Sequence, residues 1–151
     1  MSRFRAATKT DFDAIVDMMR SYYTEDGYAF SEETARTCLS TFSAHEHLGR
    51  LWVADVDGVV AGYVAVTLGF SFEYGGPDAF LDEIVIAEPY RRTGLGREAM
   101  DLALAYCRDH GVKAIHLEVE DHRAPAKRLY EQLGFEVHDR HLMTRLIDSS
   151  L

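Results

Sequence analysis

The sequence predicts an α/β (α+β) domain in which a mixed, mostly antiparallel sheet is flanked by helices. Two apolar segments, 51–56 and 59–68, read as strands, and Asp57-Gly58 between them favours the positive φ values of a tight hairpin turn. A third apolar run, 80–87, leads through a glycine turn into a helix with apolar residues on one face. An early hairpin followed by a strand–turn–helix unit is typical of a mixed sheet.

Local signals set the ends of the other elements. Thr8 and Asp11 resemble a capping box, Ser31 suits the N-cap of a second helix, and Gly111 suits the end of a third. In chain order we expect a strand at 3–6, helices after Thr8 and after Ser31, strands at 51–56, 59–68 and 80–87, a helix to about His110, a strand at 113–120, a helix from about Pro125 to Gly134, and two short strands within 135–147.

Length and composition predict one soluble domain over residues 1–151. The chain is 27% charged and 47% hydrophobic, and it has no run of 18 apolar residues, so we expect no membrane partner. No apolar segment follows the first residues, which predicts a cytoplasmic protein. Cys38 and Cys107 both fall on apolar helix faces and are expected in the core.

The formal net charge of −9 argues against a nucleic-acid partner, which needs a basic surface. It is compatible with electrostatic steering of a cationic substrate and equally with a role in solubility. The histidines show no spacing that predicts a metal site.

The most informative segment is the turn between residue 87 and the third helix, where glycines and arginines alternate. The first N–H groups of a helix lack internal partners, and glycines allow a ligand to approach the backbone closely. With adjacent arginines, this arrangement binds phosphates, in particular a pyrophosphate. The residues concerned are Arg91, Arg92, Thr93, Gly94, Leu95, Gly96 and Arg97.

Two kinds of protein use such a turn. Gly94-x-Gly96-x-x-Ala99 fits the dinucleotide fingerprint, and Glu118 follows at about the expected distance. Segment 91–96 also resembles the [RQ]-x-x-G-x-[GA] loop of the GNAT acetyltransferase superfamily. A dinucleotide fold needs several parallel strands after the turn. Here about 90 residues with a hairpin precede it and one helix–strand–helix unit follows, an order that favours GNAT.

A second segment also resembles the GNAT superfamily. Leu117-Glu118-Val119-Glu120, followed by Leu129-Tyr130 and Gly134-Phe135, is similar to the family's L-x-V … L-Y-x-x-x-G-F segment. Arg123 stands where the family often has an asparagine, so we expect any contact of Arg123 with the cofactor to have a different geometry. The resemblance covers residues 80–135 and implies a sheet that splays between its fourth and fifth strands.

The resemblance also implies acetyl-CoA as cosubstrate and no metal. It places the pantetheine arm along the backbone of Ile84, Val85 and Ile86, and the pyrophosphate on the glycine turn. By the same resemblance Tyr130 is the general acid that protonates the CoA thiolate; packing on a helix face is the alternative reading of this residue.

An alkyl ammonium must lose a proton before it can attack, and removing this proton at pH 7 costs roughly 4 kcal/mol. A carboxylate can accept the proton as general base, and three carboxylates are candidates. Glu118 falls on the strand face opposite Ile115, Leu117 and Val119, where members that acetylate protein N-termini have a base. Asp82 and Glu83 start the fourth strand, on opposite faces by strict alternation, and resemble acids of polyamine-acetylating members. The alternative for each is a solvated surface acid.

The acceptor is expected to be a small-molecule amine or a peptide. Two segments rich in aromatic and acidic residues, 22–30 and 69–76, should line the acceptor site. The candidate substrate residues are Tyr22, Tyr23 and Phe72 in these segments, together with Asp82. We therefore predict an N-acetyltransferase that works by direct attack on a small cationic amine. A protein N-terminal or lysine acetyltransferase and a non-catalytic acyl-CoA-binding or regulatory module are the alternatives, and a homodimer is compatible with the sequence.

Overall fold

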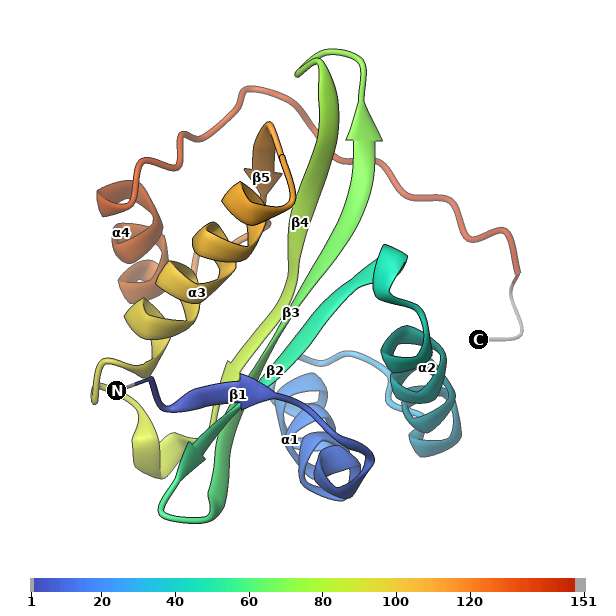
Figure 1. The fold of residues 1–151 in the computed structure, drawn as a ribbon, viewed down its shortest axis with the longest axis vertical. Helices are drawn as coiled ribbons and strands as arrows, with labels where there is room; N and C mark the ends of the chain where they lie inside the picture. Colours follow the sequence, from blue (N-terminus) through green and yellow to red (C-terminus); the bar gives the residue numbers. More distant parts are fainter. Residues whose placement is uncertain (1, 149–151) are drawn as a thin grey trace. The chain divides into compact units, whose positions relative to one another are not determined.

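The computed structural model describes residues 2–148, which divide into two compact units after Leu117. In the first unit the helices are α1 (Phe12–Glu25), α2 (Glu32–Ala44) and α3 (Leu95–Asp109), and the strands are β1 (Phe4–Ala6), β2 (Gly49–Val56), β3 (Val59–Ser71), β4 (Gly76–Ile86) and β5 (Ala114–His116) (Figure 1). The second unit contains α4 (Ala124–Gln132). That the chain forms a single domain stays a prediction.

The sheet has the order β1-β2-β3-β4-β5, and its first three pairings are antiparallel while β4 and β5 run parallel. The predicted mixed, mostly antiparallel sheet is therefore confirmed. The hairpin turn is confirmed too, because Asp57 and Gly58 have φ values of 52° and 82°.

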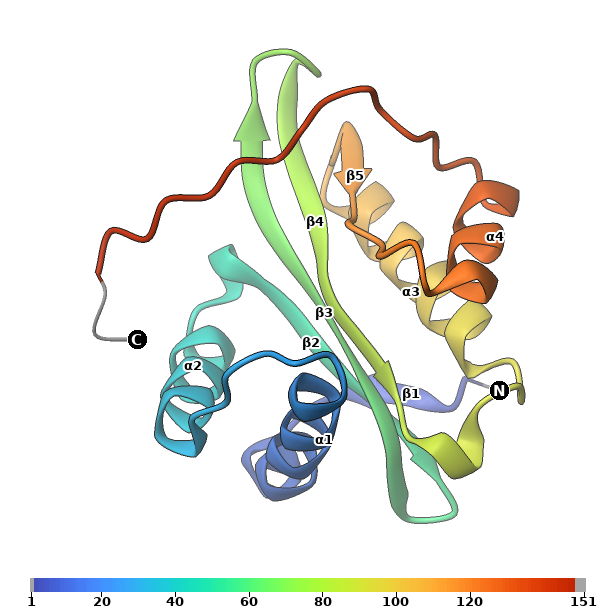
Figure 2. The same cartoon turned by 180° about the vertical axis from the view of Figure 1, so that it is seen from behind.

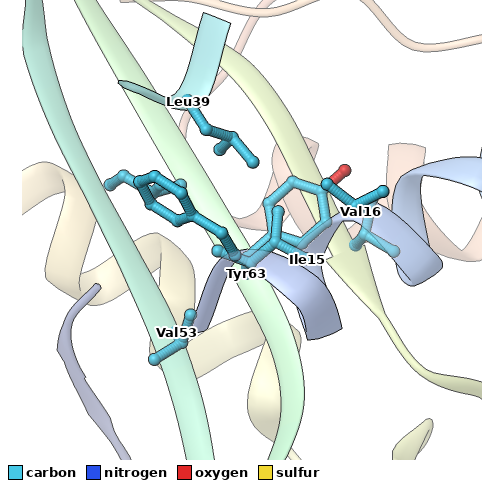
Figure 3. Close-up of a cluster of buried hydrophobic side chains, with 8 residues drawn as sticks. Ile15, Val16, Leu39, Val53 and Tyr63 are labelled. Carbon is cyan, nitrogen blue, oxygen red and sulfur yellow. The ribbon is translucent and has the colours of Figure 1, made fainter. Parts of the chain in front are cut away.

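Each face of this sheet is covered by a different set of helices. Val53, Tyr63 and Val85 are cross-strand neighbours and pack in one buried cluster with residues of α1 and α2 (Figure 3). Trp52 points to the other face, where its ring lies 5.1 Å from that of Tyr106 in α3. Figures 1 and 2 show α1 and α2 on the opposite side of the sheet from α3. Burial of each large apolar side chain contributes about 1.5–3 kcal/mol, so the two-sided packing fixes which face each residue of β4 presents.

The predicted helix starts are present in the structure. The Ser31 hydroxyl accepts a hydrogen bond of 3.2 Å from the Thr34 N–H. The Asp11 carboxylate accepts one of 2.8 Å from the Thr8 N–H and two more from the Arg5 guanidinium, whose hydrogen bonds hold the pKa of Asp11 below its usual value. Gly111 follows α3 with a φ of 66°, as a C′ glycine does. None of the helices among residues 2–148 is long and apolar enough to cross a membrane.

Three local predictions are wrong. No strand forms within 135–147, where apolar residues occur as adjacent pairs such as Leu142-Met143 and therefore do not line one face of a strand. β5 ends at His116 rather than residue 120, because its pairing with β4 stops there. Cys38 is exposed, since the buried stripe of α2 is centred on the next residue, Leu39, which points about 100° away around the helix.

Candidate active site

The glycine turn has the predicted strand–turn–helix setting. β4 ends at Ile86 and α3 begins at Leu95, with Gly94 as its N-cap residue at a φ of 88°. Glycine adopts this left-handed conformation without the steric cost that a side chain brings. The N–H groups of Leu95, Gly96 and Arg97 open a 15-residue helix, where N–H groups have no intrahelical partner and the helix dipole is positive. These groups can therefore hold a pyrophosphate.

Hydrogen bonds to neighbouring carbonyl groups hold this turn in place. The Arg3 guanidinium donates to the Thr93 carbonyl at 3.2 Å and forms an ion pair with Glu98, in the first turn of α3, at 2.9 Å. The Thr93 hydroxyl donates to the Tyr90 carbonyl at 2.6 Å. Arg3 could not be predicted as part of this turn, because no local pattern shows that the start of the chain passes it.

The arginines of the turn differ in their surroundings. Arg91 donates to the Ile86 carbonyl at 3.0 Å and has a long contact of 3.9 Å with Glu25. Arg97 has a contact of 3.7 Å with Asp101, four residues further along α3. Arg92 and Arg97 are exposed beside the turn, so their charges are available to a phosphate group.

One edge of β4 is open next to the glycine turn. β5 pairs with β4 only at Asp78, Ala79 and Phe80, whereas β3 pairs with β4 as far as Ile86. Among the described residues no strand lies against Ile84, Val85 and Ile86 on the β5 side. The sheet thus splays where the family resemblance predicts, and the edge of 84–86 that faces away from β3 is not paired with a strand, although the Ile86 carbonyl accepts from Arg91.

A bulge in β4 lies directly before Glu83. Leu81 lies opposite Val66 and Glu83 lies opposite Ala65, so Asp82 has no cross-strand partner. A two-against-one arrangement of this kind is a β-bulge. The bulge shifts the alternation by one residue, so Leu81 and Glu83 lie on opposite faces, and Glu83 shares the α1–α2 face with Tyr63 and Val85. The strict alternation that we expected for Asp82 and Glu83 is therefore interrupted.

Two tyrosine hydroxyl groups hold the Glu83 carboxylate. Tyr63 Oη donates to Oε1 at 2.7 Å, and Tyr23 Oη donates to Oε2. Burial raises the pKa of Glu83 above its usual value, the two hydroxyl donors oppose this shift, and the nearby Asp82 charge adds to it. Burial also raises the pKa of Tyr23 and that of Tyr63, so both hydroxyl groups stay protonated and act as donors. A half-buried carboxylate with a raised pKa is suited to accept a proton near neutral pH.

The other acceptor candidates of the first unit lie at different distances from Glu83. Tyr22 packs against the buried cluster and its ring lies 6.1 Å from the ring of Tyr23. Asp82 is exposed next to Glu83. Phe72 is 93% exposed at the tip of the β3–β4 hairpin, beyond Gly76, which places it about 20 Å from Glu83 along the strand. Tyr22, Tyr23, Asp82 and Glu83 are thus brought together, and Phe72 is not.

Three predicted residues belong to the second unit. Glu118 is exposed in the segment after β5, so the strand alternation used to orient it does not apply there. Arg123 is the N-cap residue of α4, and its carbonyl accepts from the Lys127 N–H at 3.1 Å. Tyr130 is 8% exposed, and its ring packs edge-on against Phe135 at 5.9 Å. Their predicted roles remain predictions.

Comparison with known proteins places this chain among acetyltransferases. Residues 12–135 match the model of the acetyltransferase (GNAT) family. The N-alpha-acetyltransferases of Sulfurisphaera tokodaii and Sulfolobus acidocaldarius are 30% and 29% identical to it, over 89% and 88% of this chain and 80% and 79% of theirs.

Solved structures agree with the sequence comparison. An integron cassette protein from the mobile metagenome of Cole Harbour Salt Marsh is similar with a TM-score of 0.86 and 30% identity, over 97% of this chain and 91% of its own. A predicted acetyltransferase from Clostridium acetobutylicum, solved with acetyl-CoA, has a TM-score of 0.80 at 15% identity, over 97% of each chain, and so shows the fold alone. The open strand edge, the glycine turn and the family match lead to one conclusion: this chain belongs to the GNAT family of acetyltransferases.

Proposed function

We propose that this protein transfers the acetyl group of acetyl-CoA to a primary amine by direct attack, with Glu83 as the general base. The observation that carries the proposal is the position of the Glu83 carboxylate. It is held by the hydroxyl groups of Tyr23 and Tyr63, and it lies on β4, the strand whose open edge leads to the glycine turn. Glu83 is favoured over Glu118 because its environment raises its pKa, whereas Glu118 is exposed beyond the end of β5.

The residues of this chain divide the work of the reaction. The N–H groups at the start of α3, with Arg92 and Arg97, would hold the pyrophosphate, and the backbone of Ile84–Ile86 would pair with the pantetheine arm. Glu83 would take a proton from the ammonium, so that the neutral nitrogen can attack the thioester carbonyl. The C–S bond then breaks, and Tyr130 would supply a proton to the thiolate, in accordance with the family resemblance. The acetylated nitrogen releases its second proton to solvent, which leaves a neutral amide.

The acceptor that we propose is a small cationic amine. The side chains around Glu83 are carboxylate and aromatic groups, namely Asp82, Tyr22 and Tyr23, which suit a positively charged group. A net charge of −9 supports this assignment through steering.

A protein or peptide N-terminus is the second candidate acceptor, because two relatives that share most of this chain's length are named N-alpha-acetyltransferases. An α-amino group has a pKa near 8 and costs only about 1 kcal/mol to deprotonate at pH 7, compared with roughly 4 kcal/mol or more for an alkyl amine. An alkyl amine therefore depends more strongly on the base.

The pH dependence of kcat/KM for Glu83→Gln tests the base. We expect the limb that rises with pH through the pKa of the base to disappear, and the rate at neutral pH to fall about 10²-fold or more. Glu118→Gln is the matched variant and should keep the wild-type profile. Asp82→Asn should keep the limb but move it to lower pH, because the Asp82 charge helps to raise the pKa of Glu83. If the limb is lost in Glu118→Gln instead, Glu118 is the base. If all three profiles match the wild type, a carboxylate base is excluded.

A further inference from the structure

Tyr63 lies at the centre of the first unit and carries a polar group that the core cannot hydrate. Its side chain is 0% exposed, and it is surrounded by apolar residues of the cluster on the α1–α2 face, including Ile15 and Val16 (Figure 3). A buried hydroxyl needs a hydrogen-bond partner, because leaving it unpaired costs free energy. The partner here is the Glu83 carboxylate, at 2.7 Å.

Regular pairing of β3 with β4 places Glu83 near this donor. Val85 lies opposite Tyr63, and Glu83 lies opposite Ala65, two residues from Tyr63 on the same face of β3. The bulge at Asp82 comes directly before Glu83, so that Leu81, opposite Val66, lies on the other face. The Tyr63–Glu83 contact therefore joins a buried donor to the last regularly paired acid before the bulge.

The two donors to Glu83 differ in their accessibility. Tyr63 projects from the interior of the sheet, where water cannot take its place. Tyr23 is only partly buried, two residues before the end of α1 at Glu25, beside the loop that leads to Phe30. If the Tyr23 hydroxyl is absent, water or the acceptor ammonium can reach Oε2. If the Tyr63 hydroxyl is absent, Oε1 faces an apolar core.

We propose that Tyr63 is the positioning residue that fixes the Glu83 carboxylate for proton transfer, and that Tyr23 is an exchangeable second donor, which the incoming ammonium replaces. This inference rests on the proposed role of Glu83 as base. It distinguishes two hydrogen bonds that look equivalent: one is a permanent part of the core, and the other belongs to the acceptor side of the site.

Three tyrosine variants test this difference. Tyr63→Phe and Tyr23→Phe each remove one hydroxyl and little volume, and Tyr106→Phe is the control, because Tyr106 is also buried but lies on the other face of the sheet. The titratable groups that face Glu83 are Asp82, Tyr23 and Tyr63, so a hydroxyl deletion changes few other interactions.

The first readout is the pH profile of kcat/KM. Loss of the Tyr63 donor destabilises the ionised form of Glu83 and so raises the pKa of Glu83. The rising limb should therefore move to higher pH, and kcat/KM on its acidic side should fall about tenfold or more. Tyr23→Phe should give a clearly smaller shift, and Tyr106→Phe should give none. Added to Glu83→Gln, Tyr63→Phe should cause no further loss. Equal shifts for Tyr63→Phe and Tyr23→Phe, or a full additional loss in the Glu83→Gln background, would overturn the proposal.

The second readout does not depend on turnover. In protein labelled with ¹³C at the glutamate carboxyl carbons, the signal missing from Glu83→Gln identifies Glu83, and its titration gives the pKa directly. Tyr63→Phe should raise that pKa more than Tyr23→Phe does. An unchanged Glu83 titration in folded Tyr63→Phe refutes the positioning role. If Tyr63→Phe raises the pKa while Glu83→Gln keeps wild-type activity, Tyr63 still orients Glu83 but Glu83 is not the base.

Should Tyr63→Phe fail to fold, Glu83→Asp offers a second route. The shorter side chain withdraws the carboxylate from the Tyr63 hydroxyl and keeps an acid at the same position. We then expect the rising limb to move and kcat/KM on its acidic side to fall. An unchanged profile in folded Glu83→Asp would contradict the proposal.

Discussion

Tyr23 and Glu83 lie 60 residues apart in the sequence, and the Tyr23 hydroxyl donates a hydrogen bond to the Glu83 carboxylate. The bond connects the end of α1 to the bulged part of β4. The pKa of Glu83 is nevertheless raised, because burial outweighs the donors. The folded protein therefore holds the Glu83 proton more tightly than the unfolded chain does.

This relationship predicts how stability depends on pH. A carboxyl group with a raised pKa stabilises the fold while it is protonated, and that contribution is lost as the pH rises from the ordinary glutamate pKa through the folded-state value. Glu83→Gln removes this dependence, so its free energy of unfolding, relative to wild type, should increase between pH 4 and pH 8. Denaturant unfolding at both pH values measures the difference. A relative stability that decreases over this range would show that the Tyr23 and Tyr63 bonds dominate.

The glycine turn predicts a loss of cofactor binding in Gly96→Glu. The added carboxylate would stand among the N–H groups that open α3 and would repel the pyrophosphate by charge and by volume. We expect the Kd for acetyl-CoA, measured by calorimetry, to rise by about 10²-fold or more. Asp101→Glu, on the same helix, is the control for added bulk. An unchanged Kd in folded Gly96→Glu would refute the assignment of the turn.

The role of Tyr130 is tested by its phenylalanine variant. If Tyr130 protonates the CoA thiolate, Tyr130→Phe should lower kcat about 10²-fold and leave acetyl-CoA affinity nearly unchanged. Tyr130 also packs against Phe135, so thermal unfolding must be followed in parallel. Full turnover in a folded Tyr130→Phe protein would show that the residue only packs.

Close packing of Gly62 in β3 against the backbone of β4 predicts that a side chain at this position destabilises the fold. A Cβ atom there would lie 2.6 Å from the Val85 carbonyl oxygen, a backbone atom that cannot move aside. Gly62→Ala should therefore destabilise the fold by about 1–3 kcal/mol. At Gly69, in the same strand, the close atom belongs to the Asp78 side chain, which can rotate away, so Gly69→Ala should cost less. Equal losses in the two variants would contradict this explanation.

The sequence was sufficient for those parts of the fold that depend on local chemistry. Asp57-Gly58, Ser31 and the glycine turn each have one favoured backbone conformation, and the structure has it. Periodicity located the strands and helices of the first unit, but not all of their ends. β5 is shorter than expected, β3 continues to Ser71, and β4 begins at Gly76, so Asp82 and Glu83 lie within β4 and not at its start. The prediction of two short strands within 135–147 was wrong, because a strand forms only with a partner strand and a single segment does not reveal that partner.

The site was harder to predict, because its geometry depends on a register. Glu83 was one of three candidate bases, and strict alternation could not choose among them, since it does not foresee a bulge at Asp82. Tyr63 and Arg3 were missed for a related reason: each acts through a contact with a residue far away in the sequence. One signal could have suggested the Tyr63–Glu83 pair: a tyrosine within an apolar strand, together with an acid within the strand that follows.

We expect this protein to catalyse acetyl transfer to an amine, and the decisive measurement is acceptor-dependent release of CoA thiol from acetyl-CoA. The assay would use monoamines, polyamines and peptides with free N-termini, with Gly96→Glu and Glu83→Gln as controls. We predict thiol release that requires an amine, is greatest with a small cationic amine, and is strongly reduced in both variants. Tight binding of acetyl-CoA without thiol release for any acceptor would contradict the claim and identify a non-catalytic acyl-CoA-binding module.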